Sequence, residues 1–116
     1  MEKYELKKEN IKFHNIVFSV TSNMDYEMER FLLLEDLEGV GPYEFVVVEG
    51  YHCSCYDFYD CKWEAVLYSV SELIEIAKDR AQGIDFYLIS DTEKNFYKLV
   101  LSYLTYKDFN ICLKEC

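Results

Sequence analysis

The sequence predicts a small α+β domain, in which a small antiparallel sheet with a central hairpin carries two to three helices packed on one face. Two neighbouring segments, residues 43–51 and 63–70, are rich in β-branched and aromatic side chains, as expected of paired strands. Two later segments each begin with Ser-x-x-Glu and repeat apolar residues at helical spacing. The chain has 116 residues, of which 51% are hydrophobic, whereas two separate cores would need roughly 200 residues. One folded domain is therefore expected, and disorder of the whole chain is excluded.

The first third of the chain is expected to supply one strand and then a segment with an ambiguous pattern. Residues 1–10 are charged and are expected to form a flexible lead-in to a single domain over residues 11–116. Ile11 to Val20 is rich in β-branched and aromatic residues, which predicts a strand. From Met24 to Leu37 the apolar residues fit a helical stripe, so this segment is interpreted as a helix. Its run of one Phe and three Leu at 31–34 is equally typical of a buried strand.

The clearest break in the pattern is Glu38-Gly39-Val40-Gly41-Pro42, which predicts a loop. Tyr43 to Tyr51 follows and contains a Phe and three consecutive Val, which predicts a buried strand. Trp63 to Val70 predicts a second strand, and we expect the two to form an antiparallel hairpin. Gly50 indicates either a bulge or the close approach of another part of the chain.

The second half of the chain is expected to contain two helices with a short strand between them. Ser69 and Glu72 have the spacing of a capping box, although Ser71 is an alternative cap, and Gly83 is placed to end this helix. Residues 84–89 predict a short buried strand. A second capping-box spacing at 90–93 opens a helix that is expected to run to about residue 107.

The acidic residues are concentrated in one part of the chain. Of the net charge of −10, the segment from Phe13 to Cys61 contributes −9, because it holds ten acidic residues and one Arg. Such a surface repels phosphate groups, so direct binding of DNA or RNA is not expected. It attracts basic surfaces and accelerates encounters with them. Solubility alone is the alternative explanation of the same charge.

The Cys content and the hydrophobic pattern indicate the compartment. There are five Cys and no apolar stretch near Met1 that would act as a secretory signal, which predicts free thiols in the reducing cytoplasm of the host cell. No run approaches the roughly 18 apolar residues that a membrane span needs, so no membrane partner is expected. The protein is expected to be cytoplasmic, as a monomer or a homodimer.

A thiol or zinc-binding module is an alternative. Its ligands would be His52, Cys53, Cys55 and Cys61, since thiolate and imidazole are the ligands that zinc prefers. The spacing is Cys-x-Cys-x5-Cys rather than the paired Cys-x2-Cys of structural zinc sites, so no metal and no other cofactor is expected. Small buried apolar residues are the competing interpretation of these Cys.

An enzyme is not expected. The chain has two His, of which His14 lies in an apolar pattern and His52 adjoins Cys53, and adjacent side chains diverge too far to act as a nucleophile and its base. A small-molecule-binding protein is kept as a further alternative. Arg30 and Arg80 are its only Arg residues, which offers little to hold a phosphate group.

An aromatic and acidic segment near the middle of the chain is the main candidate for partner binding. Tyr and Trp are enriched at binding hot spots, and carboxylates beside them pair with Lys or Arg of a partner. The same aromatic side chains are also suited to the core of a hairpin. The candidate residues are Tyr51, Tyr56, Asp57, Tyr59, Asp60 and Trp63.

A resemblance is carried by the stretch Val48-Glu49-Gly50-Tyr51-His52-Cys53-Ser54-Cys55-Tyr56-Asp57-Phe58, followed by Trp63-Glu64. It resembles a segment of small uncharacterised proteins of phages and prophages of Gram-positive bacteria, over about 20 residues of the 116. Such relatives often lack a Cys at the position of Cys61, which would remove one zinc ligand. The resemblance implies a setting, because small acidic phage proteins often bind and block host defence enzymes such as CRISPR effectors and restriction enzymes.

We therefore expect a small acidic interaction protein that binds and inhibits a basic, nucleic-acid-handling protein of host or phage, as an anti-defence or anti-CRISPR-like protein does. Anchoring is expected from the aromatic residues of the candidate segment. Steering is expected from six acidic residues, namely Asp25, Glu27, Glu29, Glu35, Asp36 and Glu38. This expectation requires the acidic residues to gather into one patch.

Overall fold

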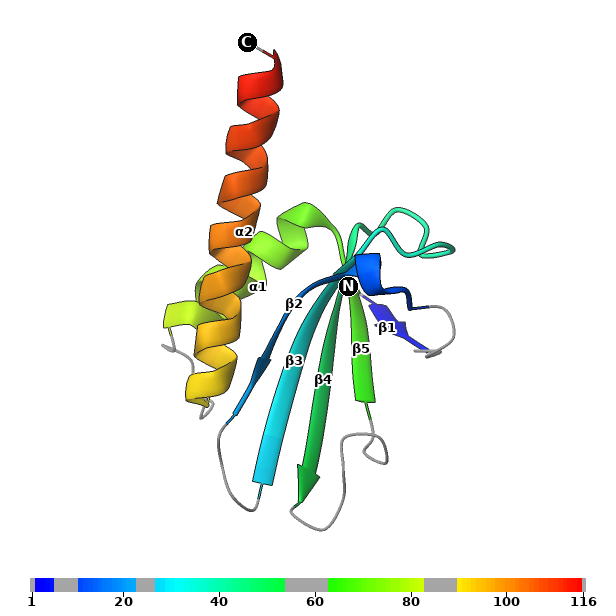
Figure 1. The fold of residues 1–116 in the computed structure, drawn as a ribbon, viewed down its shortest axis with the longest axis vertical. Coiled ribbons are helices and arrows are strands. Elements are labelled where there is room, and N and C mark those ends of the chain that lie inside the picture. Colours follow the sequence, from blue (N-terminus) through cyan, green and yellow to red (C-terminus); the bar gives the residue numbers. More distant parts are fainter. Residues whose placement is uncertain (1, 6–10, 23–26, 54–62, 83–89, 116) are drawn as a thin grey trace. The chain divides into compact units, whose positions relative to one another are not determined.

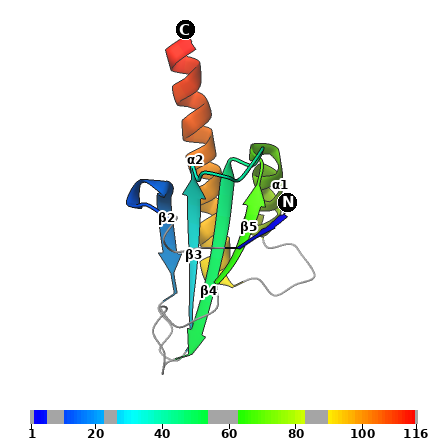
Figure 2. The ribbon, with the colours of Figure 1, turned by 90° about the vertical axis from the view of Figure 1, so that its right-hand side faces the viewer.

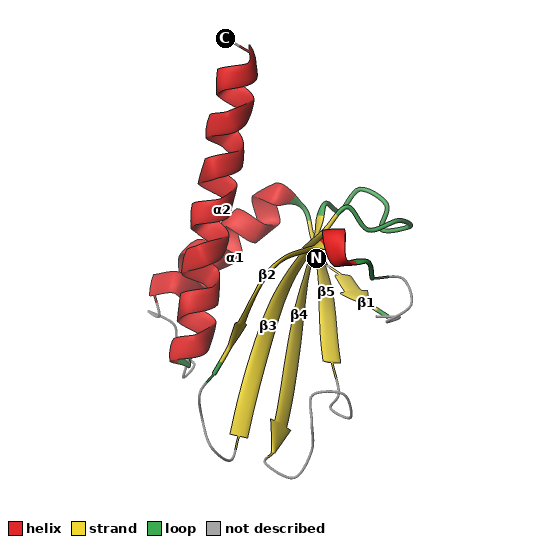
Figure 3. Ribbon diagram, in the orientation of Figure 1, coloured by secondary structure: helices red, strands yellow, loops and turns green. Residues whose placement is uncertain are grey.

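The fold is α+β, as predicted. A computed structural model describes residues 2–5, 11–22, 27–53, 63–82 and 90–115, and within them five strands form one antiparallel sheet and two α-helices follow it (Figure 3). The chain divides into two compact units, Met1–Leu73 and Ile74–Cys116, which we call the sheet unit and the helical unit. The prediction of a single domain over residues 11–116 stays a prediction.

The sheet is built from neighbouring antiparallel strands, with the shortest strand at one edge (Figure 1). Its described strands are β1 (Glu2–Tyr4), β2 (Ile16–Thr21), β3 (Glu27–Glu35), β4 (Phe45–Cys53) and β5 (Trp63–Tyr68), in the spatial order β1-β5-β4-β3-β2. A 3₁₀ turn, η2 (Phe13–Asn15), leads into β2. Figure 2 shows β2 to β5 side by side.

The predicted hairpin is confirmed as β4 and β5. The two strands pair from Phe45 opposite Tyr68 to Gly50 opposite Trp63. Three consecutive Val residues at 46–48 are each at most 5% exposed. A strand that is buried on both faces appears in the sequence as a continuous apolar run. This segment could therefore be assigned as a strand from the sequence alone.

The helix predicted from Met24 to Leu37 is wrong where the structure describes that segment, because residues 27–35 form β3. Leu34 pairs with Val46 on one face of the sheet, whereas Phe31 and Leu33 point to the other face. These three side chains are at most 1% exposed. A central strand has to be apolar on both faces, and the resulting run of apolar residues also matches a helical stripe.

The N-terminal segments differ from the prediction as well. Within the expected flexible lead-in, Glu2–Tyr4 form β1 and pair with Leu67–Ala65 of β5. The outer side of β5 would otherwise present unpaired backbone groups, and this short strand satisfies part of them. The strand expected over Ile11 to Val20 begins only at Ile16, after η2.

One face of the sheet carries a compact apolar cluster. It includes side chains of β3, β4 and β5 that alternate to the same face, together with Leu37 from the following loop. Ile11, Val40 and Tyr43 pack against its margin. Its buried members are Leu34, Leu37, Val46, Val48, Ala65 and Leu67.

The capping box predicted at the start of the first helix is confirmed. Helix α1 (Val70–Gln82) follows Ser69, whose backbone N–H donates to Glu72 Oε1 at 3.0 Å. The Glu72 N–H donates in return to Ser69 Oγ at 3.3 Å. Ser69, rather than Ser71, is therefore the cap. The expected stop at Gly83 lies outside the described residues.

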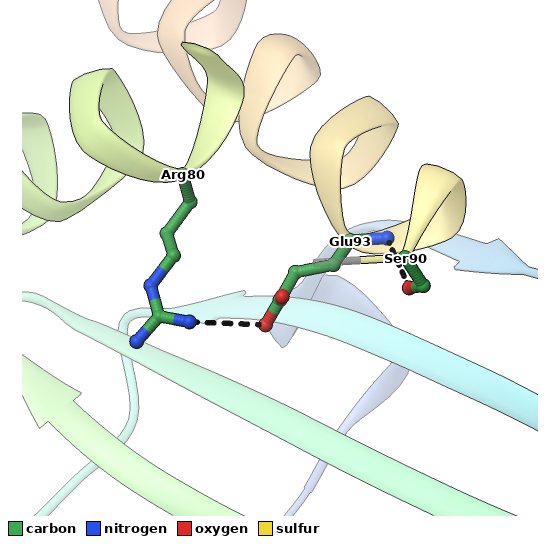
Figure 4. A network of polar contacts seen from close by, with 3 residues as sticks. All are labelled: Arg80, Ser90 and Glu93. Carbon is green, nitrogen blue, oxygen red and sulfur yellow. Dashed lines mark hydrogen bonds and ion pairs between the residues drawn. The ribbon is translucent and has the colours of Figure 1, made fainter. Parts of the chain in front are cut away.

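The second helix begins where the sequence predicts and is longer than expected. Helix α2 (Asp91–Glu115) follows Ser90, whose Oγ accepts the Glu93 N–H at 3.1 Å. In the helical unit, Arg80 Nη1 of α1 lies 3.7 Å from Glu93 Oε1 (Figure 4). The strand predicted over 84–89 lies outside the described residues. No described helix has the length and apolar content needed to cross a membrane.

Candidate protein-interaction surface

Nearly all of the net charge belongs to the sheet unit. Residues 1–73 hold fifteen acidic and six basic residues, a net charge of −9, whereas residues 74–116 hold seven acidic and six basic residues. The boundary in charge therefore follows the boundary between the two units. A candidate surface for a basic partner has to be sought on the sheet unit.

Trp63 is fixed over Gly50 at one end of the sheet. The two residues are direct partners of β5 and β4, and a Cβ atom at position 50 would overlap the Trp63 ring. The close approach that Gly50 predicts is thus made by an aromatic side chain of the neighbouring strand. Trp63 is half-buried and packs against the apolar cluster, so its ring is held while part of it stays accessible.

Arg30 lies in the same row across the sheet. It is opposite Gly50 on β4 and opposite Thr21 on β2, and its Nε donates to Thr21 Oγ1 at 2.9 Å. The row Thr21, Arg30, Gly50, Trp63 thus runs over four neighbouring strands. The Arg of the acid-rich segment is thus bonded to the neighbouring strand through its Nε.

Two carboxylates face each other across the hairpin. Glu49 and Glu64 are direct cross-strand partners, and both side chains are exposed. Glu29 of β3 lies diagonally from Glu49 on the same face, since Phe31 is the direct partner of Glu49. These carboxylates concentrate negative charge on this face of the sheet. We call Glu29, Glu49 and Glu64 the carboxylate row.

A small hollow borders the carboxylate row at β5. It has a volume of about 190 Å³ and is lined by residues of β5 together with Lys3 of β1. Known ligand pockets measure roughly 300–1,000 Å³, so this hollow is small for a metabolite-sized ligand. The described lining residues are Lys3, Trp63, Glu64, Ala65 and Val66.

A second group of acidic residues lies at the opposite end of β3. Asn15, which is buried, donates from Nδ2 to the carbonyl oxygens of Glu35 at 3.0 Å and Asp36 at 3.1 Å. The backbone N–H of Lys12 donates to Asn15 Oδ1 at 2.8 Å. Asp36 has φ of 59°, a left-handed conformation that Asp tolerates better than most residues. Asp36 and Glu38 are exposed at this end.

The predicted steering residues are therefore divided between two ends of the sheet. Glu29 and Glu35 are six residues apart on the same strand, which corresponds to about 20 Å. The described acidic residues thus form two groups instead of the one patch that we expected. Glu27 lies in β3 without a described side chain, and Asp25 lies outside the described residues.

The predicted anchors and zinc ligands lie mainly in segments that the structure does not describe. Trp63 is placed as given above, and Tyr51, His52 and Cys53 belong to the backbone of β4, without described side chains. No group of three His, Cys, Asp or Glu suited to a metal occurs among the described residues. The candidate residues outside them are Cys55, Tyr56, Asp57, Tyr59, Asp60 and Cys61.

Glu49 and Glu64 are absent from the residues that we singled out for partner binding. Both lie within the predicted hairpin strands, but their pairing follows from the strand register, which the apolar pattern alone does not specify. The sequence does contain a signal for this pairing. A large Trp ring packs best over a Gly of the neighbouring strand, so pairing Trp63 with Gly50 sets the register and places Glu64 opposite Glu49.

No protein-family model, curated protein or solved structure matches this chain.

Proposed function

We propose that this protein is an interaction protein whose sheet unit binds a basic surface of a partner protein. The partner class that fits best is a protein that handles nucleic acid, because such proteins carry the Lys and Arg clusters that an acidic surface complements. Occupying that cluster would block access of DNA or RNA, which makes inhibition the expected consequence.

The carboxylate row is the observation that carries this proposal. Glu49 and Glu64 are exposed and directly opposite each other, so they concentrate negative charge at one place on the sheet. A Lys or Arg side chain of a partner that approaches both would form charge-assisted hydrogen bonds. The net charge of −9 on the surrounding unit would accelerate the encounter.

Trp63 gives the same end of the sheet an apolar anchor. Its ring is held by Gly50 and by the apolar cluster, so little conformational entropy remains to be lost on binding. Trp is among the residues that dominate binding energy at protein interfaces. Trp63 and the carboxylate row lie on opposite faces of the hairpin at neighbouring positions of the strands.

The test is binding of a fluorescent 12-residue peptide of alternating Lys and Ala, measured by fluorescence anisotropy. The double variant Glu49→Gln with Glu64→Gln should bind at least about tenfold more weakly than the natural protein, since charged contacts contribute about 1–3 kcal/mol each. The matched control is Glu75→Gln with Asp79→Asn, which removes the same charge from exposed positions of α1 in the helical unit.

The control variant should bind the peptide like the natural protein to within about twofold. Equal weakening by both double variants would mean that only total charge matters, and the carboxylate row would then not be the binding surface.

Copurification from the native cell would identify the partner. Recovery of partners that lack a basic, nucleic-acid-binding surface would contradict the proposed partner class.

A further inference from the structure

The hollow beside β5 brings residues from both faces of the hairpin into one lining. Trp63 and Glu64 are neighbours on β5, so their side chains point to opposite faces of the sheet. Both residues nevertheless line the hollow, and its other described lining residues are Lys3, Ala65 and Val66. A group held in the hollow can therefore contact Trp63 and a member of the carboxylate row together.

The described part of the hollow lies within the sheet unit. Its lining residues belong to β1 and β5, which pair with each other through Lys3 opposite Val66 and Tyr4 opposite Ala65. On its other side, β5 pairs with β4 from Trp63 to Tyr68. Trp63 is held over Gly50, where a Cβ atom would overlap its ring. The lining is thus built on paired strands and needs little ordering when a ligand binds.

The size of the hollow suits a single side chain. Its volume is about 190 Å³, whereas pockets for metabolites begin at roughly 300 Å³. A cavity of about 150 Å³ is known to hold a benzene molecule, so this volume accepts one group of similar size with its stem. One long side chain of a partner protein is the ligand class that fits.

The chemistry of the lining favours Arg among the long side chains. Glu64 is exposed and supplies a carboxylate, and Trp63 is half-buried and supplies an aromatic ring. Val66 is half-buried and adds apolar surface. The planar guanidinium group of Arg pairs with a carboxylate through two parallel hydrogen bonds and stacks on aromatic rings. Its methylene stem packs on apolar surface, so Arg matches all three parts of the lining.

Lys3 is a cation of this chain at the same hollow. It is the direct partner of Val66, so it lies on the same face as Glu64 and diagonal to it. Its side chain is exposed, and its positive charge opposes the approach of another cation. The hollow therefore favours a group that binds more strongly than an ammonium does, which Arg achieves through bidentate pairing and stacking.

We infer that the hollow beside β5 binds one Arg side chain of the basic partner. The guanidinium group pairs with the Glu64 carboxylate and packs against the accessible part of the Trp63 ring, while the methylene groups lie along Val66. This inference rests on the proposed function and makes it more specific, because it assigns Arg rather than Lys to the position beside Trp63.

The probes are two fluorescent 12-residue peptides, one of alternating Lys and Ala and one of alternating Arg and Ala. They carry the same charge, so general attraction to the acidic unit is the same for both. Fluorescence anisotropy measures their dissociation constants for the natural protein and for two variants. Trp63→Leu keeps an apolar side chain at this position, and Trp63→Phe keeps an aromatic ring. Circular dichroism checks that both variants fold.

We expect the natural protein to bind the Arg peptide at least about threefold more tightly than the Lys peptide. Trp63→Leu should lose this preference, and Trp63→Phe should keep part of it. Equal affinity of the two peptides for the natural protein would overturn the inference. A preference that Trp63→Leu retains in full would also overturn it, by placing the guanidinium group elsewhere.

The fluorescence of Trp63 provides a second readout. Trp63 is the one Trp of the chain, so its emission reports directly on the hollow. An unlabelled Arg peptide should change this emission along a saturable curve with the dissociation constant that anisotropy gives. This measurement uses the natural protein, so the test remains valid if the Trp63 variants fail to fold. Unchanged emission when the Arg peptide is bound would contradict the inference.

Lys3→Gln tests the same hollow from β1. Its matched control is Lys12→Gln, which removes the same charge from an exposed position beside Asn15, at the other end of the sheet. We expect Lys3→Gln to bind the Arg peptide at least about twofold more tightly than Lys12→Gln does, because charge interactions weaken with distance. Equal affinities of the two variants would mean that the guanidinium group does not lie beside Lys3.

The two proposals fail differently. If the Arg peptide binds no more tightly than the Lys peptide while Glu49→Gln with Glu64→Gln still weakens binding, the hollow inference is wrong and the acidic interaction surface stands. If neither peptide binds at low salt, the proposed function fails together with the inference.

Discussion

The sheet unit and the helical unit differ in charge and in the contacts that define them. Residues 1–73 carry −9, whereas residues 74–116 are nearly balanced and include an ion pair between Arg80 and Glu93. In the sheet unit, the exposed Glu49 and Glu64 lie directly opposite each other. The comparison teaches that the charge available to a basic partner is concentrated on the sheet unit.

The largest effect on stability is expected in the core of the sheet. Leu34→Ala removes a side chain that is 0% exposed and leaves a cavity, which should lower the free energy of unfolding by about 3 kcal/mol. The matched substitution Leu99→Ala, on α2, affects a residue that is 47% exposed and should cost less than about 1 kcal/mol. Urea unfolding measures both. Similar losses of stability in the two variants would contradict the placement of Leu34 in the core and of Leu99 at the surface.

The next effect tests the contact between the two strands of the hairpin. Gly50→Ala should destabilise the protein by about 2 kcal/mol, because the new Cβ would overlap the Trp63 ring. The same change in a Trp63→Ala background should cost much less, since the overlapping ring is gone. A double-mutant cycle in thermal unfolding measures this coupling. Additive losses would mean that Gly50 is needed for backbone reasons instead.

A smaller effect is expected where the sheet unit passes into α1. Ser69→Ala removes the hydroxyl that accepts the Glu72 N–H and should cost about 1 kcal/mol. The control is Ser71→Ala, whose hydroxyl contacts Ser69 Oγ at 3.3 Å and caps no backbone N–H in the described helix. Denaturant unfolding should show a loss for Ser69 alone. A larger loss of stability for Ser71→Ala than for Ser69→Ala would contradict this assignment and identify Ser71 as the cap.

The smallest effect on stability is expected in the carboxylate row. Glu49→Gln should change the free energy of unfolding by no more than about 0.5 kcal/mol, because the side chain is exposed, while binding of the Lys-Ala peptide weakens. Urea unfolding and fluorescence anisotropy of the same variant measure the two changes. A variant that loses both stability and binding would indicate that Glu49 is a structural residue.

Features that depend on neighbouring residues could be predicted from sequence. The two Ser-x-x-Glu helix starts and the apolar hairpin strands are local patterns, and the structure confirms the caps at Ser69 and Ser90. The assignment of β3 failed because Phe31 and Leu33 are buried by long-range contacts that a local apolar run does not specify. Strand β1 was missed for the same reason, since its pairing with β5 joins residues more than sixty positions apart.

The candidate site could be predicted only in part. Composition identified the acid-rich half, but the positions of its carboxylates follow from strand register. Glu29 and Glu35 were grouped because they are close in sequence, and an extended strand separates them by about 20 Å. Glu49 and Glu64 are far apart in sequence, and the hairpin makes them neighbours.

Amide hydrogen exchange of the natural protein, with and without the Lys-Ala peptide, tests most directly whether the sheet unit is the binding unit. We expect slower exchange on binding in β4 and β5 near Glu49 and Glu64, with no change over residues 91–107 of α2. Slower exchange confined to α2, with β2 to β5 unchanged, would contradict the account.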